Sequence, residues 1–446
     1  MVQLKSVTAP ATGGWIARYE AARGALAGVG LDWLDDLRAR GLRRFAETGF
    51  PTTRVEAWKY TDLRRLARNE FQPVPEMPVA PERETLAPLL LNGAPVAVFV
   101  DGRFAPTLSA LDSLPAGVRL DSLAAALADD PAALEPHLGR IAPPEEPGGL
   151  VALNTAFMAD GAVLRIDRGA AAGVIQVLHL AGGSHAVHPR LLVVAGEDSA
   201  VTLVENFAGL GPAAGFTNAV TEIDAGAAAR IRHVRLQQEN SASWHVGLTR
   251  LRLARDATYG GFVVSSGGRL ARTEIRVRID GKGARCALDG ITLVRGRQHA
   301  DITTDFEHAS GYAESRQSFK AVLDDQSRSV FQGRILVAPD AQRTDAHLIN
   351  RNLLLSRRAQ ADSKPELIIH ADDVKCSHGA TVGDLDRDAL FYLRTRGIDE
   401  IMARGLLIEA FVRELIDGVP DEVPRTLVER TLADWLSGLG RTKEAA

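Results

Sequence analysis

The spacing of apolar residues changes twice along the chain, first near residue 150 and again near residue 383. Before residue 150 helical spacing dominates: from Leu31 to Phe45 apolar residues recur every three or four positions, which predicts a helix that ends before Pro51. Residues 96–104, with an Asp-Gly pair inside an apolar run, predict a strand that enters a turn. Residues 141–149, rich in proline and glycine, form the best candidate linker. We therefore expect an N-terminal helical and mixed domain over residues 1–149.

Residues 150–383 carry short runs of valine, isoleucine, leucine and threonine between glycine, aspartate, alanine and asparagine. Such a series of short strands is typical of a sandwich, a propeller or a parallel β-solenoid. The compact turns rich in small residues, the lack of Asn-Gly hairpin turns and the lack of an aromatic blade motif favour the solenoid. We expect a mainly β protein with a solenoid core and helical ends, although no strict repeat is visible in the sequence.

Helical spacing returns after residue 383 and predicts three helices within a C-terminal domain of residues 384–446. In the middle helix the apolar residues cover more than half of the circumference, which is more than one packed face requires. Either this helix packs on two sides within its own domain, or part of the face docks a partner protein. The apolar positions are Ile401, Met402, Leu406, Ile408, Phe411, Val412, Leu415 and Ile416.

The composition and the absence of several motifs argue against some functional classes. The chain has 446 residues, a formal net charge of −4 and 5% aromatic residues, so a nucleic-acid partner is not expected. It lacks a signal-peptide pattern, an apolar run long enough to cross a bilayer and a nucleotide-binding Walker lysine motif. We therefore expect a cytoplasmic protein without a membrane partner that does not hydrolyse ATP itself. The only two cysteines, Cys286 and Cys376, are too few and too far apart for a disulfide framework or a structural zinc site.

The stretch "ADDVKCSHGATVG", residues 371–383, holds the main chemical candidates. If the segment from 366 to 378 is one extended strand, alternate side chains share a face, and His370, Asp372, Cys376 and His378 point the same way. Cysteine and histidine could then bind one metal ion, with further ligands from elsewhere. A nucleophilic cysteine lacks an orienting third group here. The third alternative is a buried thiol beside an ordinary histidine.

Several motifs resemble those of the SufD family, subunits of the SufB–SufC–SufD iron–sulfur cluster assembly complex. The resemblance spans essentially the whole chain, and Gly379-Ala380 after His378 favours SufD over its paralogue SufB. The motifs are "EAWKYTDLRRL" (56–66), "LNTAF" (153–157), "SRQSFKAVLDDQSRSVFQGRILVAPDAQRTDA" (315–346), "NRNLLLS" (350–356), "ADDVKCSHGATVG" (371–383) and "LFYLRTRGI" (390–398).

The resemblance implies a right-handed parallel β-helix between helical domains and a non-catalytic scaffold that pairs with SufB through the end near Cys376. It implies that the C-terminal helices dock the ATPase SufC, so that the apolar face of the middle helix, Leu406, Phe411, Val412 and Leu415, has a partner. A nascent iron–sulfur cluster, or the iron acquired for it, would lie between a SufB cysteine and His378, with Cys376 as a lesser candidate ligand. A homodimer when alone and a reduced flavin in the complex are further implications.

Two other functions remain as alternatives. A β-solenoid carbohydrate-active lyase or hydrolase would carry a secretion signal, aromatic sugar platforms and paired carboxylates, and the sequence shows no such signal and few aromatic residues. An adaptor similar to SufD could bind SufC without assembling clusters. Substitution of His378 separates this adaptor from the scaffold, because an adaptor would keep full cluster assembly.

Overall fold

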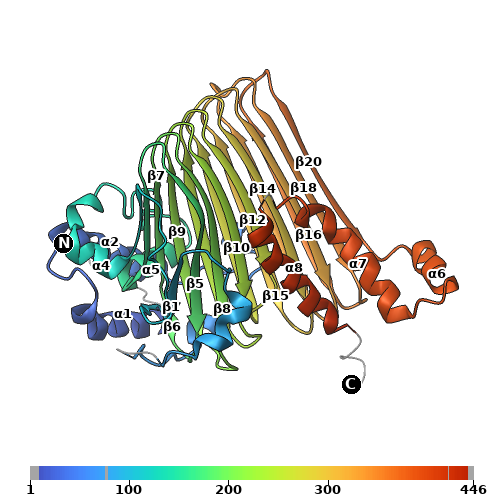
Figure 1. Ribbon diagram of the computed structural model, residues 1–446, viewed down its shortest axis with the longest axis horizontal. Helices are drawn as coiled ribbons and strands as arrows, with labels where there is room; N and C mark the ends of the chain where they lie inside the picture. Colours follow the sequence, from blue (N-terminus) through green and yellow to red (C-terminus); the bar gives the residue numbers. More distant parts are fainter. Residues whose placement is uncertain (1–9, 76–78, 420, 440–446) are drawn as a thin grey trace.

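The computed structural model describes residues 10–75, 79–419 and 421–439, and two long sheets form its centre (Figure 1). Sheet 1 has the order β2 (Arg103–Phe104), β1 (Val96–Val100), β5 (Ala171–Ala181), β8 (Ala200–Gly209), β10 (Arg230–Gln238), β12 (Thr258–Ser265), β14 (Arg285–Val294), β16 (Glu314–Leu323), β18 (Asp345–Leu354), β20 (Lys375–Gly383). Sheet 2 has the order β19 (Gln360–Ile369), β17 (Arg328–Val337), β15 (His299–His308), β13 (Leu270–Ile279), β11 (Trp244–Leu253), β9 (Phe216–Ala225), β7 (Arg190–Ala195), β4 (Gly161–Ile166), β3 (Val118–Ser122), and β6 (Ala186–Val187) pairs with β9.

From β7 onward the long strands alternate between the two sheets, and each pairs in parallel with the strand one turn earlier. This arrangement is a parallel β-solenoid with helices at both ends, which confirms the fold class expected from the sequence. The length of a turn varies, because the strand partner of Trp244 is Leu270, 26 positions later, whereas the partner of Arg328 is Gln360, 32 positions later. This variation explains why the sequence shows no strict repeat.

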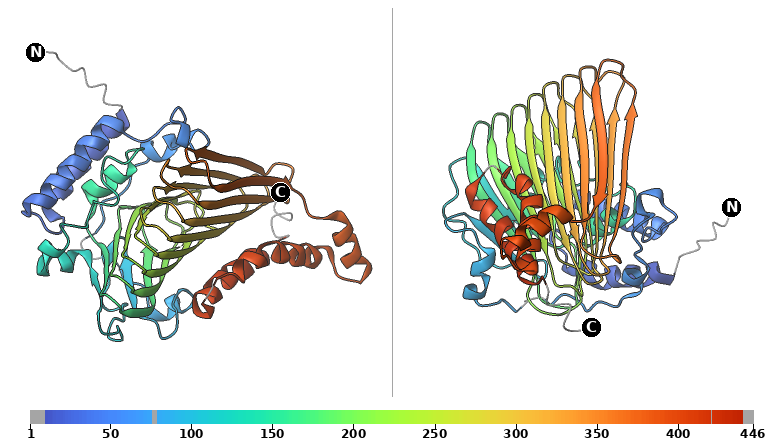
Figure 2. Two further views of the ribbon diagram at one scale, coloured as in Figure 1. Left: turned by 90° about the horizontal axis from the view of Figure 1, so that it is seen from above. Right: turned by 90° about the vertical axis from the view of Figure 1, so that its right-hand side faces the viewer.

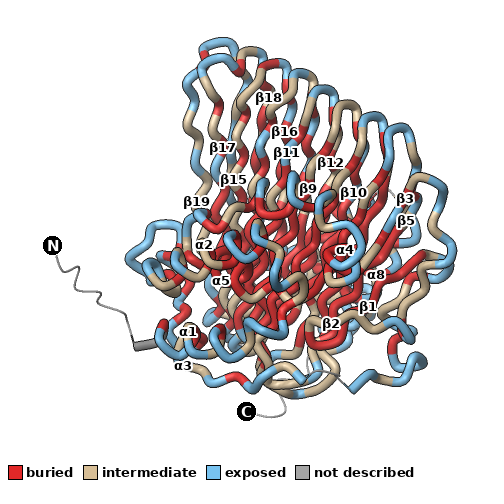
Figure 3. Tube along the Cα trace, turned by 90° about the vertical axis from the view of Figure 1, so that its left-hand side faces the viewer, coloured by how far each residue is buried: buried red, intermediate tan, exposed pale blue. Residues whose placement is uncertain are grey.

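The space between the sheets is filled by the side chains that point inward from both of them. Because the strands are in register, these residues form columns along the solenoid, as in the series Ile231, Tyr259 and Cys286, all buried. Figure 3 shows that buried residues occupy the middle of the strands, whereas exposed residues gather at the turns. The core is therefore continuous from one turn to the next and grows along one axis.

The helical elements of the N-terminal part are α1 (Pro10–Ala22), η1 (Arg23–Ala25), α2 (Asp32–Thr48), η2 (Glu56–Trp58), α3 (Arg64–Arg68), η3 (Arg83–Leu89), α4 (Leu123–Asp129), η4 (Pro131–Ala133) and α5 (Leu150–Phe157). Helices α2, α4 and α5 lie beside the first strands of the solenoid (Figures 1 and 2). Gly41 lets α2 and α5 approach closely, because a Cβ atom there would lie 2.8 Å from the carbonyl oxygen of Ala152. The segment around η2 instead reaches the late strands of the solenoid, because the carbonyl oxygen of Ala57 accepts a hydrogen bond from Gln332 on β17. In the same segment Glu56 pairs with Lys364 on β19.

The sheets begin before the expected linker at residues 141–149. Strand β1 pairs with β5 in sheet 1, and β3 pairs with β4 in sheet 2, so both sheets contain strands from the part that we expected to be a separate domain. Glu146, inside the expected linker, is buried and forms ion pairs with Arg250 and Arg276. The proposed domain division stays a prediction, and this segment packs on the solenoid.

Three C-terminal helices follow the last strand: α6 (Arg387–Thr395), α7 (Glu400–Ile416) and α8 (Glu422–Ser437). Asp386 and Asp399 cap α6 and α7, because their carboxylates accept hydrogen bonds from the first backbone amides of each helix. Helices α7 and α8 run across the outer face of sheet 1, whereas α6 projects away from the body of the protein (Figures 1 and 2). Among the described residues, none of the helices is both long and apolar enough to span a bilayer.

Candidate functional site at the open end of the solenoid

The solenoid ends in two strands that each have a neighbour on one side only. Within the described residues β20 pairs only with β18, and β19 pairs only with β17. Most strands in the middle of the solenoid are largely buried, whereas no residue of β19 or β20 is buried. The far end of the solenoid therefore presents two exposed strand edges and the last layer of its core (Figure 1).

Cys376 and His378 belong to this last layer. Cys376 continues the inward-facing column of Cys286, Ser315 and Ala346, and His378 follows Leu348 in the next column. Cys376 is half-buried against the core, whereas His378 is exposed because no further strand covers it. The two residues that the sequence singled out thus lie on one face at the open end.

The environment of Cys376 keeps its thiol protonated. Burial, followed by the nearby carboxylate of Asp345, raises the pKa of Cys376 above its ordinary value of 9.0. Cys286 lies in the same column three strands away, which corresponds to about 14 Å at the usual strand spacing. This separation excludes a disulfide between them, and both thiols are free.

The expectation that His370 and Asp372 share a face with Cys376 is wrong. Strand β19 ends at Ile369 and β20 begins at Lys375, so both residues lie in the turn between the two sheets. The period-two rule does not extend across this turn, because the chain changes sheet there. Only Cys376 and His378 remain as neighbours on the inward face.

This chain alone supplies an incomplete ligand set. The described residues contain no group of three or more histidine, cysteine, aspartate or glutamate side chains that could hold a metal ion. The imidazole of His378 has no hydrogen-bond partner or ion pair within the described part of the chain, so no third group orients it as a base for Cys376. An exposed neutral imidazole is able to bind a metal ion, whereas the thiol of Cys376 would first have to lose its proton.

The sequence did not reveal a row of interacting polar side chains on the opposite face of the same strands. Ser377 and His347 face each other across β18 and β20, with 2.6 Å between Oγ and Nδ1, and Asp345 lies 2.6 Å from Nε2 of the same ring. Asp345 and His347 stand two apart in the sequence, which hints at a shared face. The contribution of Ser377, 30 positions later, depends on the strand register and has no sequence signal.

A second missed feature is a charged network inside the solenoid. Arg235 donates hydrogen bonds to Glu205 at 2.7 Å and to Nε2 of His245 at 3.1 Å, and all three side chains are buried. Burial raises the pKa of Glu205, but the charge of Arg235 and the hydrogen bond from His233 outweigh it and hold this pKa well below the usual range. The charges are paired and buried, so the network offers no open site.

The predicted partner-binding residues of the C-terminal helices are divided between the protein's own core and its surface. Val412 and Leu415 are buried against sheet 1, and Phe411 is half-buried in the same cluster. Leu406 is 44% exposed. Other large apolar side chains are exposed near it on α6 and α7, namely Phe391, Tyr392, Ile401 and Met402. The first alternative from the sequence, packing within the protein itself, explains why Val412 and Leu415 are apolar. Leu406 is exposed and could contact a partner.

Comparison with known proteins assigns the family. A model described as the SufBD core domain of SUF-system FeS cluster assembly matches residues 178–411, and a SufBD N-terminal region model matches residues 11–177. The chain is 32% identical to the iron–sulfur cluster assembly protein SufD of Escherichia coli K12, over 90% of this chain and 92% of that protein. It is also 32% identical to an iron–sulfur cluster assembly SufBD family protein of Synechocystis, over 83% of this chain and 84% of that protein.

These matches cover nearly the whole chain and agree with the solenoid and its helical ends. They give no support to the carbohydrate-active alternative. The chain therefore belongs to the SufBD family of the SUF iron–sulfur cluster assembly system, in which it is SufD-like.

Proposed function

We propose that this chain is a non-catalytic scaffold subunit that pairs with a SufB-like protein through the open end of its solenoid. The observation that carries the proposal is the position of His378. It occupies an inward-facing position in the register of the core, yet it is exposed because the solenoid stops there. A partner that adds the next layer would cover His378 and bring its own ligands to it.

The strand edges support this mode of pairing. Strands β19 and β20 have 10 and 9 residues, and one edge of each pairs with no other strand in the part of the chain that the structure describes. Unpaired strand edges readily add another strand, since their backbone groups are already aligned for hydrogen bonding. A SufB-like solenoid would extend both sheets, and in its absence a second copy of this chain would form a homodimer through the same edges.

The nascent cluster, or the iron acquired for it, is the cargo of this interface. We propose His378 as one ligand and a cysteine of the SufB-like partner as another, with Cys376 as a lesser candidate. A mixed imidazole and thiolate set binds iron–sulfur clusters less firmly than four thiolates, which suits a cluster that must be released. No residue of this chain is assigned to a flavin, and a reduced flavin in the complex stays a prediction.

The C-terminal helices are the proposed docking site for a SufC-like ATPase. Leu406 and Met402 stand one helical turn apart on α7, and both are exposed. Phe411, Val412 and Leu415 would act indirectly, since they hold α7 on sheet 1. ATP hydrolysis in the complex would then belong to the partner and would be transmitted to this chain through α7.

Co-expression with SufB and SufC from the same genome tests the scaffold role, with size-exclusion chromatography and iron and sulfide analysis under anaerobic conditions. We expect a complex of all three proteins that contains iron and sulfide. His378→Ala should leave the complex intact and lower its cluster content, whereas the matched control His370→Ala, an exposed histidine in the preceding turn, should not. A His378→Ala complex with full cluster content would instead support the adaptor alternative.

The docking of SufC is tested separately with Met402→Glu and Leu406→Glu. We expect both variants to retain SufB and to lose SufC from the complex. Thr426→Glu, which adds the same charge at an exposed position of α8, is the control and should retain SufC. Loss of SufC from the control but not from the α7 variants would contradict the assigned surface.

A further inference from the structure

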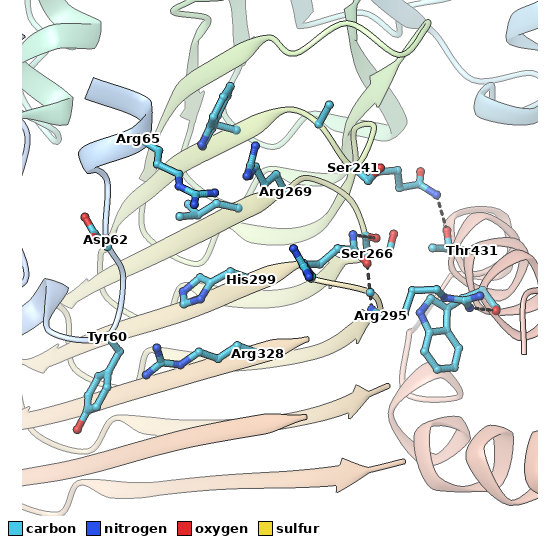
Figure 4. Close-up of a pocket in the computed structure, with 18 of the residues that line it drawn as sticks. Tyr60, Asp62, Arg65, Ser241, Ser266, Arg269, Arg295, His299, Arg328 and Thr431 are labelled. Atoms are coloured by element: carbon cyan, nitrogen blue, oxygen red, sulfur yellow. Dashed lines mark hydrogen bonds between the residues drawn. The ribbon is translucent and has the colours of Figure 1, made fainter. Parts of the chain in front are cut away.

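A large cavity lies away from the open end, between three parts of the chain. Its volume is about 970 Å³, and its walls come from α3 and the segment before it, from the turns at one edge of the solenoid and from α8 (Figure 4). Representative lining residues are Tyr60 and Arg65 from the N-terminal part, Arg269 and Arg297 from the turns, and Asp434 from α8. A volume of this size is at the upper end of the range for small-molecule sites.

Arginines outnumber carboxylates along the lining of this cavity. Five arginines line it, Arg65, Arg269, Arg295, Arg297 and Arg328, against two carboxylates, Asp62 and Asp434. Asp62 is already paired with Arg64, which does not line the cavity. Arg328 is paired with Asp362, and Arg295 donates to the backbone carbonyl of Trp435.

Three of the arginines are exposed and lack a direct ion pair in the described part of the chain, although Arg65 lies close enough to Asp62 to lower the pKa of its carboxyl. Across the described ranges, Arg65, Arg269 and Arg297 form no ion pair with any carboxylate. Arg269 only lies beside the ring of Trp244, with its Cζ 5.9 Å from the ring centroid. Figure 4 shows the side chains of Arg65 and Arg269 extending into the same space from separate elements. Convergent like charges repel each other, and a bound anion would remove that repulsion.

We propose that this cavity binds a small molecule that carries a chain of phosphate groups. The planar fork of an arginine matches phosphate oxygens, and arginines from three separate segments could each hold a different part of such a chain. Ser241 and Ser266 line the same space, and their hydroxyl groups can add neutral hydrogen bonds. The phosphate chain could belong to free pyrophosphate or to a nucleotide. Bound there, it would link α8 to the solenoid turns and to the N-terminal segment.

Isothermal titration of the full chain with pyrophosphate and with ADP tests the site without any partner protein. Binding of both ligands in competition, with affinity that falls as salt increases, is the expected result. Tighter binding of ADP would identify a nucleotide as the source of the phosphates, and equal or tighter binding of pyrophosphate would identify the phosphate chain alone. Failure of both to bind at millimolar concentration would overturn the proposal, and it would leave the proposed scaffold role unaffected.

Charge variants locate the site. Arg269→Gln and Arg297→Gln should each weaken binding by about tenfold, the loss expected when one charge-assisted contact is removed. Asp434→Asn should strengthen binding, because it removes a carboxylate that lines the cavity and that forms no ion pair with the residues described. The control is Arg119→Gln, at an exposed arginine of β3 that does not line the cavity and has no ion pair over residues 10–75, 79–419 and 421–439. Equal losses in Arg269→Gln and Arg119→Gln would show that binding is nonspecific and would contradict the proposal.

Discussion

Lys320 on strand β16 donates a hydrogen bond of 2.7 Å to the backbone carbonyl oxygen of Phe411 on helix α7. The ammonium group also lies 2.6 Å from the carboxylate of Glu414 and 5.2 Å from the ring centroid of Phe411. Lys320 is 3% exposed, so a buried side chain connects α7, the proposed docking helix for the ATPase, to the solenoid.

Lys320→Ala should therefore loosen α7. We expect the free energy of unfolding to fall by about 1–3 kcal/mol, because the carbonyl of Phe411 loses its charged donor. Urea denaturation measures this loss, and hydrogen exchange should report faster exchange in α7. Glu414→Gln is the matched control, since it keeps the bond to Phe411 and should change stability by less than Lys320→Ala; an equal effect would assign the role to the exposed ion pair.

A buried ion pair joins the N-terminal part to the solenoid. Glu222 on β9 accepts two hydrogen bonds from Arg190 and three from the backbone amides of Gly139, Ile141 and Ala142. Glu222→Gln should lower the free energy of unfolding by about 3–5 kcal/mol, since it leaves a buried guanidinium without its counter-charge. Arg252→Gln breaks an exposed pair with Asp224 and should cost about 1 kcal/mol or less in the same denaturation experiment. Similar losses in the two variants would contradict this assignment.

Buried histidines should make the protein less stable in mild acid. Burial lowers the pKa of His179 and His308 to about 4 and that of His188 to about 3, from an ordinary value of 6.5. As the pH falls below 6.5 the unfolded chain takes up protons that the folded chain does not bind. Stability is therefore full above pH 6.5 and decreases toward pH 4, by about 1.4 kcal/mol per pH unit for each histidine.

His179→Phe tests this linkage. The imidazole ring of His179 stacks between Phe99 and Phe207, so a phenylalanine ring should fit in its place. The substitution removes no hydrogen bond at Nδ1, because this buried atom forms none with the residues described. Urea denaturation at several pH values between 7.5 and 4.5 should give a smaller slope of stability against pH for the variant, by about one proton. An unchanged slope would show that His179 does not contribute.

Two helical glycines should respond in opposite directions to substitution. Gly41→Ala would place a Cβ against the backbone of α5, and we expect a loss of about 1–3 kcal/mol from the resulting overpacking. Gly405 on α7 has open space around its Cα, so Gly405→Ala should gain up to about 1 kcal/mol through higher helix propensity. Thermal denaturation of the two variants compares them directly, and destabilisation by both would show that Gly405 is also confined.

The two thiols should differ in reactivity. Cys286 is buried in the core, where burial holds the pKa of its thiol well above the ordinary value, so iodoacetamide should not modify it in the folded protein. Cys376 is partly accessible with a raised pKa, so its alkylation should be slow at pH 7 and should accelerate as the pH increases past 9. Mass spectrometry after timed labelling measures both sites; fast alkylation of Cys376 at neutral pH would indicate a thiolate.

The order of elements could be inferred from the sequence, because helices and strands leave local periodic patterns. The acidic caps at Asp386 and Asp399 and the glycine after Thr48 mark helix ends where the structure has them. The prediction of one continuous strand over 366–378 was wrong, because the chain turns between Ile369 and Lys375. This turn contains no glycine or proline that would have indicated it. A solenoid corner is set by the stacking of the preceding turns, which lie about 30 residues earlier in the chain, so the local pattern does not reveal it.

Local sequence alone therefore determined the fold class and, through its resemblance to a family, the stretch that holds Cys376 and His378. Only the tertiary structure decided that these two residues face inward on a final, uncovered layer, because that position depends on the register of β18 with β20 and on the absence of a further strand in the described part of the chain. It also decided that Val412 and Leu415 are covered by sheet 1, and that arginines from separate segments line one cavity. The burial and the electrostatic environment of a side chain depend on residues that are distant in the sequence. In this solenoid the paired residues lie about 30 positions apart, so the local sequence pattern does not show which of them come together.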